Sequence, residues 1–373
     1  MYVGRHLYFV CVFLAENNPM SDSSLRVQQR KRETRAMTSY LKREIIVIFT
    51  LLKDNFIICL IPHLTLYISI SSAVSCPTPS GVWSIVLLAL LYQLAFDTIN
   101  QLVGIEEDAI NKPHRPLPSG TIDVHGCIVL CIVVNAAYLT VGALHGVGLW
   151  CALWQLVSVG YLLRFDKNWF YKNHVFIPAG IVVQYMTAVC LANDGMYSQE
   201  LVLWVFVMSV YFGLCATVQD IRDVAGDRAT KRRTLPVILG LERTRYLFLA
   251  VMGIFSPIML RWYIVAPVWD AHCGLLAMTY CPFHVLIIYR LAAMKNAGDH
   301  RLTYSLVIWM YIVTSASMYY IAPKLLLTDR NQPSIQSFNQ PIDPSLNQSA
   351  GRSIHIVNDI YTAHAEWRWA LLT

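Results

Sequence analysis

Residues 201–227 read LVLWVFVMSVYFGLCATVQDIRDVAGD, an apolar run of near membrane-spanning length that ends in three carboxylates. Asp220, Asp223 and Asp227 recur at i, i+3 and i+7, which places them on one face of a helix. Carboxylates are costly at the end of a membrane span and usually have a function there. Three oxygen donors without a neighbouring His or Cys favour a hard cation such as Mg²⁺. The alternative is a solvated helix face, because basic residues are interspersed in the same window.

The composition of the whole chain indicates a polytopic membrane protein. Its 373 residues are 56% hydrophobic and only 14% charged, and the mean hydropathy is +0.47, which is unlike a soluble globular protein. A helix needs about 20 residues to cross the hydrocarbon core. Nine apolar runs reach or approach that length: 56–75, 82–99, 124–144, 147–163, 174–192, 201–218, 246–266, 273–290 and 304–321. The predicted fold class is therefore all-α, a polytopic membrane protein with a bundle of about nine transmembrane helices.

Basic residues alternate between the loops that join these runs. Lys and Arg occur in loops 101–121, 164–173, 219–245 and 290–303, and neither occurs in loops 76–81, 145–146, 193–200 and 267–272. The positive-inside rule places the basic loops in the cytosol and the carboxyl tail on the other side. Asn347-Gln348-Ser349 in that tail is a glycosylation sequon, so we expect a multi-pass protein of the endoplasmic reticulum. The net charge of +6 then indicates an anionic leaflet or substrate as partner and no nucleic acid.

A second polar cluster follows the second apolar run. On a continuous helix Asn100, Gly104 and Asp108 fall on one stripe, with Glu107 beside it. The next loop, residues 111–120, carries Lys112 and Arg115 among three prolines, which restrict the conformation of the chain.

The two clusters share one chemical pattern. The three aspartates are followed by the basic residues Arg228, Lys231, Arg232 and Arg233, as the first cluster is followed by Lys112 and Arg115. Each cluster supplies carboxylates that can bind a divalent cation and basic side chains that can bind phosphate oxygens. Because both clusters lie on one side of an apolar bundle, the pattern indicates a site for a diphosphate with a hydrocarbon tail. Ordinary positive-inside loops would explain the bases but not the carboxylates beside the spans.

The complete second cluster resembles the second motif of the UbiA superfamily of intramembrane prenyltransferases, Asp-x-x-Asp-x-x-x-Asp. Residues 111–120 are similar to the arginine-proline-glycine continuation of the family's first motif, and the resemblance covers residues 45 to 323. We therefore expect three regions: a basic cytoplasmic lead-in at 1–44, a UbiA-like transmembrane catalytic domain at 45–323 and a polar, disordered tail at 324–373.

The first motif of the family, Asn-Asp-x-x-Asp-x-x-x-Asp, is matched only at Asn100 and Asp108. Gln101 and Gly104 stand where the family has Asp. Glu107 lies close to the same helical face and offers a replacement carboxylate.

The resemblance implies an Mg²⁺-dependent enzyme that removes diphosphate from an allylic prenyl diphosphate and leaves a carbocation. The catalytic residues it implies are Asn100, Asp108, Asp220, Asp223 and Asp227. The implied metal-binding residues are Glu107, Asp108, Asp220, Asp223 and Asp227. The implied diphosphate-binding residues are Lys112, Arg115, Arg228, Lys231 and Arg233.

Three features are most like the UbiA-type terpene cyclases: Lys53-Asp54 followed by Ile61-Pro62, the variant first motif, and Asn111-Lys112-Pro113. This resemblance implies a terpene cyclase that makes a cyclic sesquiterpene from farnesyl diphosphate. The alternative is a prenyltransferase that moves the prenyl group to an aromatic or quinone-precursor acceptor. A secondary transporter is less favoured, because the acids cluster at one membrane face and no inverted repeat is evident. In a terpene cyclase, aromatic residues in the spans would stabilise the positive charge of the cation. Otherwise they serve in packing or in interfacial belts.

Overall fold

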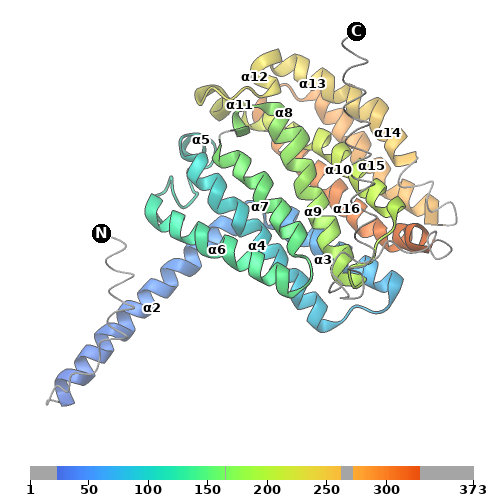
Figure 1. The fold of residues 1–373 in the computed structure, drawn as a ribbon. Helices are drawn as coiled ribbons and strands as arrows, with labels where there is room; N and C mark the ends of the chain where they lie inside the picture. The colour runs from blue at the N-terminus through green and yellow to red at the C-terminus, as the bar shows by residue number, and fades with distance from the viewer. Residues whose placement is uncertain (1–22, 164, 262–271, 328–373) are drawn as a thin grey trace, which may run out of the picture. The chain divides into compact units, whose positions relative to one another are not determined.

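The computed structural model describes residues 23–163, 165–261 and 272–327, and over these residues the chain is helical, with one isolated bridge between Asn168 and Arg233. Figure 1 shows the arrangement of the helices. The elements are α2 (Ser23–Lys53), α3 (Phe56–Val74), α4 (Pro79–Val103), α5 (Ile105–Asn111), α6 (Val124–Leu144), α7 (Gly148–Leu162), η1 (Phe165–Lys167), α8 (Trp169–Tyr171), η2 (Lys172–Phe176), α9 (Ile177–Ala192), α10 (Gln199–Ala216), α11 (Val218–Ala229), α12 (Leu235–Leu239), α13 (Leu241–Ala250), η3 (Val251–Phe255), α14 (Ser256–Met259), α15 (His272–Ala293), η6 (Ala297–Asp299) and α16 (His300–Leu327).

Six of the described helical segments are long and apolar enough to cross a membrane: Phe56–Val74, Pro79–Val103, Val124–Leu144, Trp169–Ala192, Gln199–Ala216 and Ala297–Leu326. They coincide with six of the nine predicted runs. Run 147–163 forms α7, which is apolar but shorter, run 273–290 lies in α15, and run 246–266 extends beyond the described residues. The all-α, polytopic membrane class is confirmed, and the count of nine spans stays a prediction.

Helix α3 packs against α4, α9 and α16, while α10 packs against α9 and α16. Inside a bilayer, helices associate through close contact of their surfaces, and small residues allow that contact. Gly213 of α10 is such a residue, because a Cβ there would lie 2.7 Å from Pro178 Cγ and 2.8 Å from the Asn173 carbonyl oxygen. The glycine therefore sets the approach of α10 to the start of α9.

Each acidic motif ends on a short helix of its own. Helix α4 stops at Val103 and α5 starts at Ile105, while α10 stops at Ala216 and α11 starts at Val218. Helices α5 and α11 pack against each other. The two motifs, far apart in sequence, thus meet at one end of the bundle.

The ends of the predicted catalytic domain fall within helices. Helix α2 runs through the predicted boundary at 44/45, and Val47 and Leu51 are buried in its second half. Arg43 of α2 donates from Nε and Nη2 to the Thr121 carbonyl oxygen at 3.1 and 2.9 Å. Helix α16 continues past residue 323 to Leu327. The predicted disorder and the sequon at Asn347 lie outside the described residues.

Candidate active site

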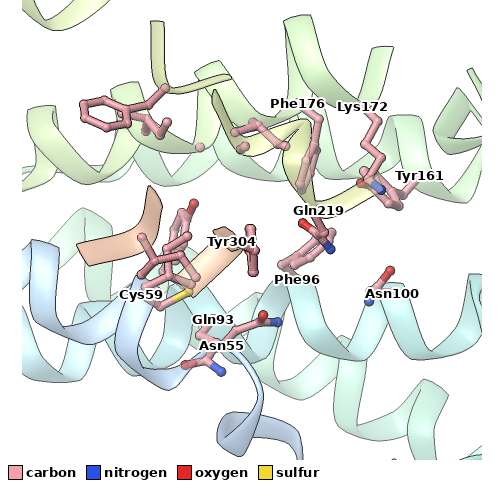
Figure 2. Close-up of a pocket in the computed structure, with 18 of the residues that line it drawn as sticks. Asn55, Cys59, Gln93, Phe96, Asn100, Tyr161, Lys172, Phe176, Gln219 and Tyr304 are labelled. Carbon is pink, nitrogen blue, oxygen red and sulfur yellow. The ribbon is translucent and has the colours of Figure 1, made fainter. Parts of the chain in front are cut away.

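A cavity with a charged end lies between α3, α4, α9 and α16. Its charged lining comprises Glu107, Asp108, Lys112, Arg115, Lys172 and Arg232, and its uncharged polar lining comprises Asn55, Gln93, Asn100, Gln184 and Gln219. Most of the remaining lining is apolar or aromatic: Ile58, Cys59, Tyr92, Phe96, Trp154, Tyr161, Phe176, Ile177, Ile181, Phe212, Tyr304, Val307, Ile308 and Tyr311. Figure 2 shows Lys172 and Phe176 on one wall, with Phe96 and Asn100 on the opposite one. The cavity therefore combines a polar mouth with a largely apolar interior.

The depth of the cavity follows the chain from η2 into α9. Lys172, Phe176, Gly180 and Gln184 line it at intervals of four residues, which is about one helical turn each. The charged residue of this series, Lys172, is the first of the four along the chain. At the other end Gln184 accepts a hydrogen bond of 2.5 Å from the Tyr311 hydroxyl and donates one of 3.2 Å to the Ile58 carbonyl oxygen.

Arg115 organises the first motif. It donates from Nη1 to Asp108 at 2.8 Å and from Nε to Asp54 at 3.0 Å, and it is 4% exposed. Gln101 also holds this loop, because its Oε1 accepts a hydrogen bond from the Leu117 amide at 3.2 Å and its Nε2 donates to Asp108 at 3.4 Å. The amide that stands where the family has Asp therefore positions Asp108 and the proline-braced loop.

The predicted continuous helix through the first motif is wrong, because the helix breaks at Gly104. This residue has φ −99° and ψ 16° and separates α4 from α5. The poor helix propensity of glycine accounts for a break at this point. After the break both Glu107 and Asp108 are buried and line the cavity, whereas Glu106 is exposed. Two adjacent carboxylates of α5 thus reach the site, although successive residues of a helix lie about 100° apart around its axis.

The three aspartates of the second motif are buried, and each has a partner. Asp220 accepts from Lys172 Nζ at 2.7 Å and from Asn173 Nδ2 at 2.9 Å. Asp223 accepts two bonds of 2.7 Å from the Arg222 guanidinium and one of 3.3 Å from Gln219.

Asp227 is the least satisfied of the three. Its Oδ2 accepts from Thr234 at 3.0 Å, while Oδ1 is buried without a hydrogen-bond partner and lies 3.7 Å from Arg232 Nη1. The aspartates do not line the cavity themselves. The side chains of Lys172, Gln219 and Arg232, which contact them, do.

Arg232 joins the two motifs. Its guanidinium forms an ion pair with Glu107 of the first motif and lies 3.7 Å from Asp227 of the second. Asn111 makes a second connection, because its Nδ2 donates to the Asp223 carbonyl oxygen at 3.4 Å. A Cβ at Gly226 would collide with the Asn111 side chain, so a glycine is needed where α11 approaches α5.

The structure separates the predicted basic residues into two groups. Lys112 and Arg115 line the cavity, whereas Arg228, Lys231 and Arg233 are exposed and do not. The predicted set omits two cations that line it, Lys172 and Arg232.

The backbone explains why Arg232 faces inward. Lys231 has φ +56°, the Arg232 amide donates to the Asp227 carbonyl oxygen at 2.8 Å, and the Arg233 amide donates to the Lys167 carbonyl oxygen at 2.9 Å. This turn directs the middle residue of three successive cations to the acids. For Lys172 the available signal was a cation at the start of an apolar run, which is costly unless it has a partner.

The two aspartates at the end of the second motif differ in acidity. Burial raises the pKa of Asp227 to about 6, and the charges of Asp220 and Glu107 add to this increase against the opposing charge of Lys172. Burial would also raise the pKa of Asp223, but the hydrogen bonds and charge of Arg222 outweigh it and lower that pKa to about 2. Burial lowers the pKa of Lys112, and the charge of Arg115 acts in the same direction. Asp223 is therefore ionised throughout the physiological range, whereas Asp227 titrates near its acidic limit.

The donor set fits a hard divalent cation. In the described part of the chain no three His, Cys, Asp or Glu side chains lie close enough together to hold an ion, and basic side chains pair with the carboxylates. The site nevertheless offers Glu107 and Asp108 in the cavity wall, and Asp227 behind Arg232 has an Oδ1 that accepts no hydrogen bond. All three are oxygen donors of the kind that Mg²⁺ prefers. A metal would take over carboxylate oxygens that now face Arg115 and Arg232.

The fold defines a polytopic helical membrane protein, and the cavity is its candidate active site. The family model described as the UbiA prenyltransferase family matches residues 60–323. The chain belongs to this family and is a prenyltransferase-like enzyme, as the paired motifs predicted.

The similar proteins include two that are named synthases and one that is named a cyclase. The chain is 31% identical to somaliensene A/B synthase of Streptomyces somaliensis over 65% of its own length and 81% of that protein. It is 32% identical to the diterpene cyclase eriG of Hericium erinaceus, over 40% of its own length and about half (49%) of that protein. It is 25% identical to digeranylgeranylglyceryl phosphate synthase of Natronomonas pharaonis, over 55% of this chain and 77% of that protein.

Solved structures share the fold. A UbiA homolog from Archaeoglobus fulgidus, bound to DMAPP and Mg²⁺, superposes with a TM-score of 0.54 at 13% identity, covering 73% of this chain and 99% of that one. A digeranylgeranylglyceryl phosphate synthase structure superposes with a TM-score of 0.52 at 17% identity, covering 75% and 99%. These likenesses support an integral membrane protein of this fold.

Proposed function

We propose that the protein ionises an allylic prenyl diphosphate with the help of Mg²⁺ and that the cation then cyclises within the cavity. The meeting of two acidic motifs at the charged end of an aromatic-lined cavity carries this proposal. Farnesyl diphosphate is the proposed substrate, because the residues around Asp54 and Asn111 resemble those of the terpene cyclases. Relatives named somaliensene A/B synthase and diterpene cyclase support cyclisation, although a diterpene has a longer chain than farnesyl diphosphate supplies.

The charged end would bind the diphosphate. Glu107, Asp108 and Asp227 would hold Mg²⁺, with Asp223 and Asp220 as the further carboxylates of the motif. The bound metal would supply Lewis-acid polarisation of the leaving diphosphate. Lys112, Arg115, Lys172 and Arg232 would neutralise the negative charge that develops as the allylic C–O bond breaks and its electron pair leaves with the diphosphate. The exposed Arg228, Lys231 and Arg233 would act only in attracting the substrate.

The apolar interior would hold the cation away from water. Tyr92 and Trp154 stack with their centroids 4.4 Å apart, and Trp154 also packs on Phe176 at 4.9 Å. Aromatic faces in a dry cavity stabilise positive charge as it moves along the chain. An enclosing wall also keeps the prenyl chain folded so that its own double bond attacks the cation. The cyclised cation would then lose a proton to the released diphosphate, which gives the neutral cyclic hydrocarbon.

Acceptor prenylation is the second candidate function. Relatives named polyprenyl transferase eriF and digeranylgeranylglyceryl phosphate synthase favour it. The two reactions share the ionisation step and differ in the nucleophile, which is a double bond of the substrate in one case and a separate molecule in the other.

Purified protein incubated with Mg²⁺ and farnesyl diphosphate alone is expected to release a cyclic hydrocarbon, detected by gas chromatography of an organic extract, together with diphosphate. A parallel reaction contains a panel of aromatic and quinone-precursor acceptors. No product without acceptor and a prenylated product with one would refute cyclisation and leave the ionisation site intact.

The same proposal places the charged end at the cytosolic face of the endoplasmic reticulum membrane, because the basic loops surround it. Cysteines introduced by Ser119→Cys and Arg228→Cys, at two exposed positions, are expected to react with an impermeant reagent added from the cytosolic side. The unmodified chain gives the background from its own exposed Cys76 and Cys281. Labelling of the two positions from opposite sides would contradict the topology.

A further inference from the structure

Gly180 lines the cavity at the point where the stacked pair Tyr92 and Trp154 meets α9. It lies two turns beyond Lys172, about 12 Å along the helix. Gln184, one turn further, marks the distal end. A change at Gly180 would therefore affect the apolar part of the cavity and leave the charged end in place.

No other side chain fits at this position without a shift of the wall. A Cβ on Gly180 would lie 2.7 Å from the Tyr92 hydroxyl oxygen, 2.9 Å from Trp154 Cζ3 and 3.1 Å from Trp154 Cη2. Carbon atoms in contact are normally about 3.5–4.0 Å apart. The missing side chain thus lets the aromatic pair lie directly against the backbone of α9.

The aromatic pair is held firmly and cannot absorb an added methyl group locally. The Trp154 indole Nε1 donates to the Tyr92 carbonyl oxygen at 3.2 Å, and its ring is 4.4 Å from that of Tyr92 and 4.9 Å from that of Phe176. Trp154 is 2% exposed and Tyr92 is 5% exposed. Displacement by a methyl group would therefore move the rings into the cavity that both of them line.

We propose that Gly180 determines how long a prenyl chain the cavity accepts. The inference rests on the proposed function, since it takes the hydrocarbon tail of a prenyl diphosphate as the occupant. The diphosphate would stay at Lys172 and the other cations, and only a tail long enough to pass Gly180 would meet the aromatic pair. One additional methyl group in an apolar pocket changes selectivity by about 10–200-fold.

The test compares Gly180→Ala with the unmodified protein for geranyl, farnesyl and geranylgeranyl diphosphate. Both equilibrium binding in detergent and the kcat/KM of diphosphate release are measured. We expect Gly180→Ala to weaken use of the longest chain by about tenfold or more relative to the shortest. Gly253→Ala is the matched control, because Gly253 is exposed in η3 and has no atom within 4 Å of an added Cβ.

Two further variants separate chain selection from simple misfolding. Gly180→Ala combined with Tyr92→Phe removes the shortest contact and is expected to recover part of the lost binding of the longest chain. Trp154→Phe alone removes the ring atoms next to Gly180 and is expected to shift the binding ratio towards the longest chain. Equal losses for all three chain lengths in Gly180→Ala, or an unchanged ratio in Trp154→Phe, would overturn the inference.

The two readouts distinguish this inference from the proposed function. If the unmodified protein releases no diphosphate from any of the three compounds, the proposed function fails, while the binding ratios still decide the role of Gly180. If diphosphate is released and the ratios do not change, only the role of Gly180 fails.

Discussion

Asp227→Asn is expected to lower the rate of diphosphate release by more than the roughly 10–100-fold that follows loss of a group supporting a metal ligand. The substitution keeps the shape of the side chain and removes its charge. It replaces a buried carboxylate whose Oδ1 has no hydrogen-bond partner in the described structure, which makes this oxygen the most available of the motif. Stabilisation of the purified protein by added Mg²⁺, measured as a shift of the apparent unfolding temperature, is expected to disappear together with the activity.

The matched control for this variant is Asp194→Asn. Asp194 is exposed, lies in the loop between α9 and α10, and has φ +48°, a conformation that Asn also tolerates. The Asp194→Asn variant should retain wild-type activity and the wild-type response to Mg²⁺. In the unmodified protein the response to Mg²⁺ should weaken as the pH falls through about 6, because Asp227 then becomes protonated. Normal turnover and Mg²⁺ response in Asp227→Asn would show that Asp227 does not bind the metal.

Lys172→Met is expected to destabilise the protein by about 3–5 kcal/mol, because it leaves a buried carboxylate without its counter-ion. Lys172 and Asp220 are 7% and 0% exposed, and their charged atoms are 2.7 Å apart. The double variant Lys172→Met/Asp220→Asn carries no net unpaired charge and should recover much of the loss. The apparent unfolding temperature in detergent measures each member of the cycle.

Lys167→Met provides the comparison for this cycle. Lys167 is exposed, and only its backbone carbonyl takes part in the contact with Arg233. Its replacement should change the unfolding temperature little. If Lys172→Met and Asp220→Asn destabilise the protein additively, the two charges do not depend on each other.

The apolar runs and the spacing of the aspartates were sufficient to predict the class of fold and the meeting of the two motifs. A run such as 124–144 is apolar throughout and lies in the helix Val124–Leu144, since a bilayer leaves few other conformations for such a segment. Asp220, Asp223 and Asp227 share one short helix, α11, as their spacing predicted. These are local properties that the sequence pattern carries by itself.

The partners of the acids could not be predicted in the same way, because they depend on contacts between distant segments. Arg232 and Arg233 are equivalent in the sequence, and a single residue with positive φ decides which of them reaches Glu107. Lys172 and Asp220 are 48 residues apart along the chain. Gly104 was predicted as a helical position, whereas the helix breaks there, and Glu107 and Asp108 both line the cavity from the short helix α5.

The π-helical turn η2 has a consequence for how this enzyme can change. It occupies Lys172–Phe176, immediately before the α-helical Ile177–Ala192. A π-turn accommodates an additional residue within a helix, so removal of one residue within it would let the turn relax to α-helix while the residues on either side kept their directions. A deletion within α9 itself would instead rotate the residues before it by about 100° relative to those after it. We therefore expect the turn to tolerate a one-residue deletion that would disconnect Lys172 from the hydrocarbon wall if it fell in α9.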